Sequence, residues 1–269
     1  LGDQLNIADR TSTTRQVVHS IKPTWHSACF VIMRKSFIIL LGFILVACGF
    51  FFNHNQTDSI YTFKEGDPYG TGKWYMGREI AYVMGFHGMD WLERPEREEE
   101  ENVSKLLKNL DLEPTDVVAD IGAGSGYHVF RMAPDLTKGK VYAVDIQQEM
   151  LDVMKKKKEE RDIENVELIK GSEKSTNLPP NSVDKILMVD VYHEFSYPRE
   201  MLESMKQALK PGGAIYLIEY RKEDKWVPIK EVHKMTEGQA VKEFEASGFV
   251  LDKNIGNLPW QHCMVFRIP

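Results

Sequence analysis

The sequence predicts an α/β fold in which a mostly parallel sheet of seven strands lies between two layers of helices and the last strand is antiparallel. Two observations carry this prediction. From Asp116 onward, strand candidates alternate with helical stretches, as in an open sheet built from strand–helix units. Near the C-terminus, two strand candidates follow each other with only the short loop 256–259 between them, which indicates an antiparallel pair.

The elements of this sheet follow one another in residues 106–269. The strand candidates are 117–121, 140–145, 166–170, 183–190, 214–220, 249–254 and 263–268. The helices between them are expected near 126–133, 147–157, 199–209 and 238–247. No internal repeat interrupts this order.

Residues 61–105 are predicted to form a helical cover over the sheet. Residues 78–84 are expected to form a short helix, and a stronger helix begins near Pro95, because proline suits the first helical position. Glu96, Glu98 and Glu99 suit the positive end of that helix, and the acidic run Glu98–Glu101 is interpreted as a solvated surface. The side chains expected to close over a site as a lid are His87, Trp91 and Arg94.

Residues 33–48 have the pattern of a secretory signal peptide. Two basic residues precede an apolar run of about ten residues, which is shorter than the roughly 20 residues that span a bilayer. The end of this segment, Leu45-Val46-Ala47-Cys48, resembles a bacterial lipobox. The resemblance implies that Cys48 is lipidated and becomes the mature N-terminus. A short anchor or a buried helix is the alternative reading.

The flanking segments complete this interpretation. Residues 1–32 read as an upstream extension without a structural role, and residues 49–60 read as a polar tether. Positive charge precedes the apolar run and is absent directly after it, so the folded part should be exported. We therefore expect a membrane-anchored lipoprotein of the bacterial cell envelope that faces the periplasm or the exterior.

Charge and cysteine content exclude several classes of site. The formal net charge is −6 at pH 7 and the isoelectric point is near 5.8, whereas a nucleic-acid-binding protein usually has a basic face. No nucleic-acid partner is therefore expected. The three cysteines lack the spacing of a zinc site and do not form a disulfide framework.

A loop with three alternating glycines follows the first predicted strand and reads Asp120-Ile121-Gly122-Ala123-Gly124-Ser125-Gly126. Glycine allows a sharp turn and lets a ligand approach the backbone. The helix that follows offers free N–H groups to a negative ligand group. Asp145 ends the second strand about twenty positions later, where a carboxylate can accept hydrogen bonds from both hydroxyls of a ribose. The loop and this carboxylate together predict a nucleotide site.

Tyr127 decides between two kinds of nucleotide. The dinucleotide fingerprint requires glycine or alanine at this position. The loop instead resembles motif I of the class I S-adenosylmethionine-dependent methyltransferases, and the turn 209–213 resembles the one before the fifth strand of that family. The resemblance implies a Rossmann-like three-layer sandwich with S-adenosyl-L-methionine as its cofactor.

The resemblance also implies roles for individual positions. By position, the methionine part and the ribose would be lined by Gly122, Ala123, Gly124 and Gly126. Asp120 would orient the loop or the amino group of the ligand. The ribose and adenine would be held by Asp145 and Ile146, and the adenine amino group would contact Ser172 or Glu173.

The segment after the fourth strand is where that family places groups that face the methyl group. Here it reads Asp190-Val191-Tyr192-His193-Glu194. His193 is the candidate general base with Glu194 as its orienter, Tyr192 is expected to pack against the substrate, and Asp190 to contact the cofactor or the reacting groups. The alternative is that His193 and Glu194 only cap a helix. No second and third metal ligand is evident beside Asp190, so no metal is expected.

The sequence thus predicts an S-adenosylmethionine-dependent methyltransferase that acts on a small molecule or an envelope component. A module that binds the cofactor without catalysis is the alternative from a different class. An NAD(P) oxidoreductase is a third reading, against which Tyr127 argues.

Overall fold

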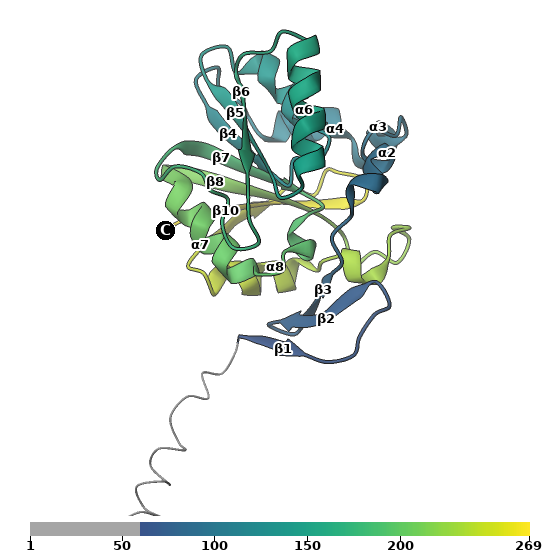
Figure 1. The fold of residues 1–269 in the computed structure, drawn as a ribbon. Helices are drawn as coiled ribbons and strands as arrows, with labels where there is room; N and C mark the ends of the chain where they lie inside the picture. The colour runs from purple at the N-terminus through teal and green to yellow at the C-terminus, as the bar shows by residue number, and fades with distance from the viewer. Residues whose placement is uncertain (1–59) are drawn as a thin grey trace, which may run out of the picture. The chain divides into compact units, whose positions relative to one another are not determined.

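A seven-stranded sheet with the strand order β6-β5-β4-β7-β8-β10-β9 forms the centre of the protein (Figure 1). The computed structural model describes residues 60–269, so the expected signal peptide, Cys48 and nearly all of the tether lie outside the described residues. The strands are β4 (Val117–Ile121), β5 (Lys140–Asp145), β6 (Val166–Lys170), β7 (Val183–Val189), β8 (Leu209–Tyr220), β9 (Val250–Asn254) and β10 (Gln261–Arg267).

The strand directions confirm the predicted fold. Strands β4 to β8 pair in parallel, and β10 pairs antiparallel with both β8 and β9. The chain runs outward from β4 through β5 to β6, then returns to β7 on the other side of β4 and continues to β8. The carboxyl ends of β4 and β7 therefore flank the point where the strand order reverses, which is where open α/β sheets bind their ligands.

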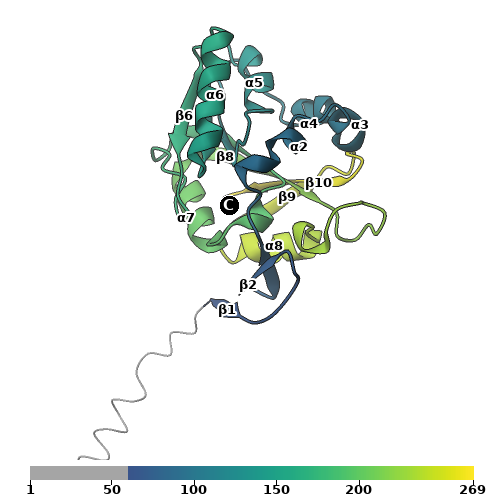
Figure 2. The ribbon, with the colours of Figure 1, turned by 45° about the vertical axis from the view of Figure 1, so that its right-hand side comes forward.

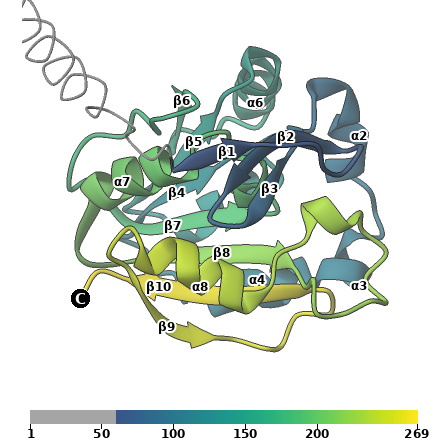
Figure 3. The ribbon, with the colours of Figure 1, turned by 90° about the horizontal axis from the view of Figure 1, so that it is seen from below.

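Helices cover both faces of the sheet (Figures 2 and 3). One face packs against α4 (Val103–Asn109), α5 (Val129–Met132) and α6 (Gln148–Glu160), and the other against α7 (Pro198–Ala208) and α8 (Glu237–Glu245). Alternate residues of each strand serve opposite faces. Val118 packs toward the first layer and Ala119 toward the second. This alternation produces the three-layer sandwich.

The N-terminal cover begins with strands, which corrects the expectation of a helical cover. β1 (Tyr61–Phe63), β2 (Gly70–Tyr75) and β3 (Arg78–Ala81) form a separate antiparallel sheet, so the short helix expected over residues 78–84 is absent. Met76 and Gly77 turn the chain between β2 and β3 with φ values of 49° and 101°. Positive φ at both central residues is typical of a two-residue hairpin turn. The Met-Gly pair was the missed signal for this hairpin.

The helical part of the cover is divided. It comprises η1 (Phe86–Gly88), α2 (Met89–Leu92), α3 (Arg97–Glu101) and α4. The sequence predicted one helix from Pro95, but Asn102 adopts a left-handed φ of 54° and separates α3 from α4. The side chain of Asn102 then accepts a hydrogen bond from the Lys105 N–H at 3.1 Å, which caps α4. Within residues 60–269, no helix is both long and apolar enough to cross a bilayer.

Candidate functional site

A cavity of about 680 Å³ opens at the carboxyl ends of the parallel strands, next to the point where the strand order reverses. It is lined by residues that follow β4, β5, β6 and β7, by side chains between Tyr69 and Leu92, and by the loop after β8. Of the sequence-predicted site residues, the cavity is lined by Gly122, Gly124, Asp145, Ile146, Ser172, Glu173, Asp190, His193 and Trp91. It is not lined by Asp120, Ala123, Gly126, Tyr192, His87 or Arg94.

The glycine loop after β4 has the left-handed backbone that its sequence requires. Gly122, Gly124 and Gly126 have φ values of 74°, 56° and 82°. A Cβ atom on Gly124 would lie 2.7 Å from the side chain of Leu92, and one on Gly122 would collide with Val191. The loop therefore excludes side chains where the backbone lines the cavity.

Asp145 ties the second strand to this loop. Its Oδ2 accepts a hydrogen bond from the Gly124 N–H at 2.8 Å, and its Oδ1 accepts one from the Gln147 N–H at 2.8 Å. Burial raises the pKa of this carboxyl even though both backbone bonds lower it. Each carboxylate oxygen keeps a free lone pair. Asp145 can thus also accept hydrogen bonds from ribose hydroxyls in the cavity.

Asp120 lies behind the loop, at the end of β4. It is 2% exposed, its Oδ2 has no hydrogen-bond partner among the described residues, and burial raises its pKa to about 7. An unsatisfied buried carboxylate oxygen is costly. Asp120 does not line the cavity, so its negative charge would act on the ammonium group of the predicted cofactor only from behind the glycine loop.

Ser172 and Glu173 follow β6 and are both exposed in the cavity wall. The hydroxyl of Ser172 lies 3.3 Å from the carbonyl oxygen of Ser175 and donates to it. Glu173 makes no hydrogen bond within residues 60–269, so its carboxylate is free to accept from an adenine amino group, and the Ser172 oxygen also keeps lone pairs for this.

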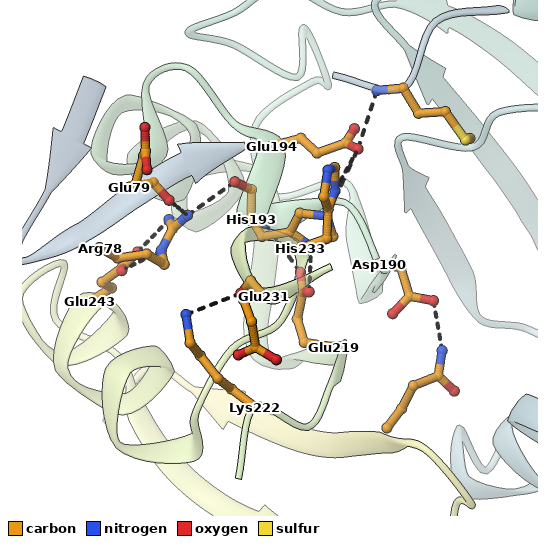
Figure 4. Close-up of polar contacts among 12 residues, drawn as sticks. Arg78, Glu79, Asp190, His193, Glu194, Glu219, Lys222, Glu231, His233 and Glu243 are labelled. Atoms are coloured by element: carbon orange, nitrogen blue, oxygen red, sulfur yellow. Dashed lines mark hydrogen bonds and ion pairs between the residues drawn. The ribbon is translucent and has the colours of Figure 1, made fainter. Parts of the chain in front are cut away.

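The opposite wall of the cavity contains a polar cluster around His193, which lies in η3 (Tyr192–Glu194) directly after β7 (Figure 4). His193 Nδ1 lies 2.6 Å from Glu219 Oε2 on β8, while His193 Nε2 is 3.8 Å from Glu194 Oε1. The carboxylate that orients His193 is therefore Glu219, and the expectation that Glu194 has this role was wrong. Burial lowers the pKa of His193, but the charge of Glu219 more than offsets this effect and the pKa is raised.

A second histidine completes the cluster and was missed from the sequence. His233 belongs to η4 (Glu231–His233), and its Nδ1 lies 3.1 Å from His193 Nε2 and 3.6 Å from Glu194 Oε1. Burial raises the pKa of Glu194 to about 7, and burial followed by the charge of His193 lowers the pKa of His233 to about 4. The loop after β8 carries no motif that would have indicated His233.

Arg78 of β3 links the backbone of this wall to helix α8. Its guanidinium donates to both carboxylate oxygens of Glu243 on α8 at 2.8 and 2.9 Å and to the carbonyl oxygen of His193 at 3.0 Å (Figure 4). All three residues are buried. The N-terminal sheet thus helps to hold the backbone on which the histidine is placed.

Tyr192 has a structural position rather than the expected contact with substrate. Its ring is fully buried and lies 5.5 Å from Phe195 and 5.2 Å from Phe244, between ring centroids, in the core on the α7–α8 face. The neighbouring His193 instead lines the cavity. The ring of Tyr192 is part of the core and is therefore not available to contact a ligand in the cavity.

The acidic run of α3 is only partly solvated, which corrects its interpretation as a surface feature. Glu101 is 1% exposed and accepts hydrogen bonds from Arg94 at 2.6 Å, Arg97 at 2.6 Å and the Tyr220 hydroxyl at 2.9 Å. Burial, with the negative charge of Glu101 next, raises the pKa of Asp190. This group of charges closes the cavity between α3 and β8.

The lid candidates separate in the same region. Trp91 lines the cavity and is 46% exposed, whereas the guanidinium of Arg94 stacks on its ring at 3.7 Å and points to Glu101. His87 is exposed and does not line the cavity. Arg94 therefore supports the lid from behind, and His87 lies outside the cavity lining.

Known proteins resemble this chain over the same region. A family model described as a methyltransferase domain matches residues 112–262. An uncharacterised methyltransferase of Bacillus subtilis is 25% identical over 174 residues, which are 64% of this chain and 68% of that protein. An uncharacterised methyltransferase-like protein of Schizosaccharomyces pombe is 31% identical over 124 residues, which are 46% of each chain.

The fold has a similar solved structure. A S-adenosylmethionine-dependent methyltransferase of Aquifex aeolicus is 28% identical, with a TM-score of 0.66, over 70% of this chain and 100% of that chain. Because the family model spans more than half of the sequence, the chain belongs to the methyltransferase domain family. This membership gives no support to the reading as an NAD(P) oxidoreductase.

Proposed function

We propose that this methyltransferase domain moves a methyl group from S-adenosyl-L-methionine to a small-molecule acceptor bound in the same cavity. One observation carries the proposal: a single cavity joins the glycine loop and Asp145 to the polar cluster of His193, Glu194 and His233. Its volume, about 680 Å³, lies within the range of roughly 300–1,000 Å³ that is typical of small-molecule sites.

The residues around the glycine loop fit the cofactor. Asp145 has free lone pairs for the ribose hydroxyls, and the loop leaves room for a ligand against its backbone. The buried carboxylate of Asp120 lies behind the loop, where its charge would attract the ammonium group without touching it. When bound, S-adenosyl-L-methionine supplies a methyl group on a positively charged sulfur. The task of the protein is to position the acceptor against that methyl group, since alignment alone lowers the barrier greatly.

The other walls indicate the kind of acceptor. Aromatic and aliphatic side chains surround the cavity mouth, which suits an acceptor with an apolar body: Tyr69, Tyr82, Val83, Trp91 and Ile229. The polar cluster lies deeper, so we expect a hydroxyl or amine group to point toward it. Such a nucleophile must lose a proton as it is methylated. His193, held by Glu219 through Nδ1, presents Nε2 as the group to receive that proton.

A binding module without catalysis would not need this cluster. Burying two histidines and a carboxylate next to each other beside a ligand cavity lowers the stability of the fold. Cofactor binding alone does not require such a cluster. The cluster therefore favours the enzyme over the module.

The proposal is tested with purified full-length chain. Calorimetric titration should show binding of S-adenosylhomocysteine and no binding of NAD. Incubation with methyl-labelled S-adenosylmethionine and a panel of apolar phenols, alcohols and amines should then identify a labelled product. Binding of NAD without binding of S-adenosylhomocysteine would overturn the proposal.

We also propose that the protein is anchored to the cell envelope through a lipid on Cys48. The support is the sequence pattern of residues 33–48 and the polar residues that follow. Metabolic labelling with a fatty acid should mark the wild-type protein and leave Cys48→Ser unlabelled. A wild-type protein without lipid would contradict the anchor and leave the methyltransferase proposal unaffected.

A further inference from the structure

We infer that His193, Glu194 and His233 form a binding site for a divalent transition metal ion, for which Zn²⁺ is the best fit. The three side chains come from two segments, since η3 follows β7 and η4 follows β8 (Figure 4). Within the described part of the chain, these three residues each place one possible ligand atom within 4.8 Å of the other two.

The distances between the ligand atoms match a metal site. His193 Nε2 lies 3.1 Å from His233 Nδ1 and 3.8 Å from Glu194 Oε1, and the last two atoms are 3.6 Å apart. A point equidistant from the three atoms in their plane lies about 2.0 Å from each, close to the roughly 2.0–2.2 Å of zinc bonds to imidazole nitrogen and carboxylate oxygen. An ion therefore fits with little movement of the side chains.

The groups around the cluster orient its ligands as in known metal sites. Because a carboxylate can only accept, the 2.6 Å contact with Glu219 places the proton of His193 on Nδ1 and leaves Nε2 with a lone pair for a metal. Glu194 Oε1 accepts a hydrogen bond from the Met84 N–H at 3.2 Å, which fixes the carboxylate from the other side. Such outer contacts are typical of metal ligands, and the contact with Glu219 also satisfies the buried Nδ1–H of His193.

The position of the site suggests a catalytic ion. All three side chains line the cavity, so an ion with three protein ligands would keep a coordination position open toward it. Two histidines with one carboxylate are also a donor set that imidazole-preferring metals such as zinc and iron(II) accept, whereas Mg²⁺ prefers oxygen ligands.

The chemical role rests on the proposed function. A divalent ion would lower the pKa of an acceptor hydroxyl bound to it, so this hydroxyl would release its proton to solvent at neutral pH before it is methylated. In that case His193 Nε2 is a metal ligand and does not receive the proton itself. The presence of the ion is independent of this role and can be measured without any acceptor.

The test uses tag-free full-length protein, because an affinity tag of histidines would bind the same metals. The protein is stripped with a chelator and titrated with Zn²⁺ against a chromogenic competitor. We expect one equivalent bound with a Kd of micromolar or lower and no competition by Mg²⁺. Co²⁺ should give the intense visible spectrum of a four-coordinate site.

Variants separate this site from adventitious binding. His233→Ala and Glu194→Gln should weaken Zn²⁺ binding at least about 100-fold, and Glu219→Gln about 10–100-fold, as expected for an outer-shell partner. His262→Ala is the matched control, because His262 is also buried and pairs with the carboxylate of Glu223 at 3.0 Å outside the cavity. The exposed His87 provides a second control through His87→Ala.

The outcomes are distinct. Zn²⁺ affinity that is equal in the wild type and in His233→Ala would overturn the inference and leave a hydrogen-bonded pair of histidines. Binding of S-adenosylhomocysteine, measured on the same samples, serves as the check on folding. A wild-type protein that binds S-adenosylhomocysteine but not Zn²⁺ would overturn only the metal site. A wild-type protein that binds Zn²⁺ but not S-adenosylhomocysteine would overturn only the proposed function.

Discussion

The two ends of the cavity are built in different ways. The glycine loop and ribose carboxylate of the cofactor end come from one strand–loop–helix–strand stretch, from Asp120 to Asp145, and are 21 residues apart at their hydrogen bond. The acceptor wall combines His193 and Glu194 with Glu219 and His233, whose contacts with His193 span 26 and 40 residues. The first end is specified by backbone conformation and the second by side chains that meet only in the folded protein.

This difference predicts how each end responds to substitution. At the cofactor end, backbone N–H groups and a single carboxylate act on the ligand, so changes there should alter cofactor affinity. At the acceptor wall, the side chains act on the acceptor's proton, so changes there should alter turnover. A variant that moved both quantities equally would show that the two ends are not separate.

The largest effect is expected for His193→Ala. Methyl transfer should fall about 10²–10⁴-fold, the usual contribution of a positioned proton-transfer group, while the affinity for S-adenosylhomocysteine stays within a factor of two to three, roughly. Steady-state kinetics and calorimetry on the same preparation check both parts. Near-normal turnover would mean that His193 is structural and that the acceptor arrives already deprotonated.

Asp120→Asn tests the buried carboxylate at the cofactor end. The folded-state pKa of Asp120, about 7, lies above the unfolded value, so the neutral form is favoured by folding. The contribution of the neutral Asp120 to the free energy of unfolding is therefore fully present below about pH 4 and is lost as the pH rises through about 7. In the ligand-free protein at pH 8, Asp120→Asn should raise the free energy of unfolding by up to a few kcal/mol, at about 1.4 kcal/mol per pKa unit, and so raise the melting temperature. At pH 4 the same substitution should have little effect.

The same substitution should have the opposite effect on ligand binding. If the negative charge of Asp120 attracts the ammonium group of the ligand, Asp120→Asn should lower the affinity for S-adenosylhomocysteine at pH 8, where the wild-type carboxyl is charged. A variant that is destabilised at pH 8 and binds normally would assign the carboxylate to the fold alone.

Asp145→Ala should weaken S-adenosylhomocysteine by about 1–3 kcal/mol, or roughly 5–150-fold, because ribose hydroxyls then lose their partner in a closed site. The same variant also removes the acceptor for the Gly124 N–H. Asp145→Asn keeps one acceptor oxygen and should lose less affinity. Unchanged affinity in Asp145→Ala would remove this residue from the ribose role.

The smallest effect is expected at the cover. Trp91→Ala should raise the KM for the acceptor a few-fold, with little change in kcat, since the ring lines the cavity but is half-exposed. Arg94 stacks on the ring, an interaction typically of about 0.5–1 kcal/mol at exposed sites. His87→Ala, outside the cavity, should behave as the wild type. A large fall in kcat for Trp91→Ala would instead place the lid in the catalytic step.

Elements with a strong local pattern were predicted well from the sequence. The seven strands of the sheet, the glycine loop and Asp145 lie where the sequence predicts them. Central strands such as β4 are nearly continuous apolar runs, and a left-handed loop needs glycine, whereas the edge strands β6 and β9 are short and partly exposed. The reversed last strand also followed from the short loop before it. Each of these features depends on residues close together in the chain.

The N-terminal cover shows where such reasoning failed. Residues 78–84 contain helix-compatible residues, yet β3 forms because a hairpin partner, β2, lies just before it and Arg78 finds Glu243 on a distant helix. Glu101 resembles its solvated neighbours in sequence, yet in the interior two arginines balance its charge and the Tyr220 hydroxyl donates a hydrogen bond to it. Tertiary partners overrode local propensity at both positions.

What the sequence by itself determined is the parallel sheet, its antiparallel last strand and the glycine-loop end of the cavity, since backbone geometry constrains residue type there. What only the tertiary structure decided is the acceptor wall. In the sequence, Glu219 has no feature that separates it from the rest of a buried strand, and His233 has none that separates it from the rest of a loop. Both reach His193 only because β7 and β8 lie side by side. Parallel strands bring their carboxyl ends to one edge, and the side chains gathered there have no spacing rule in the sequence.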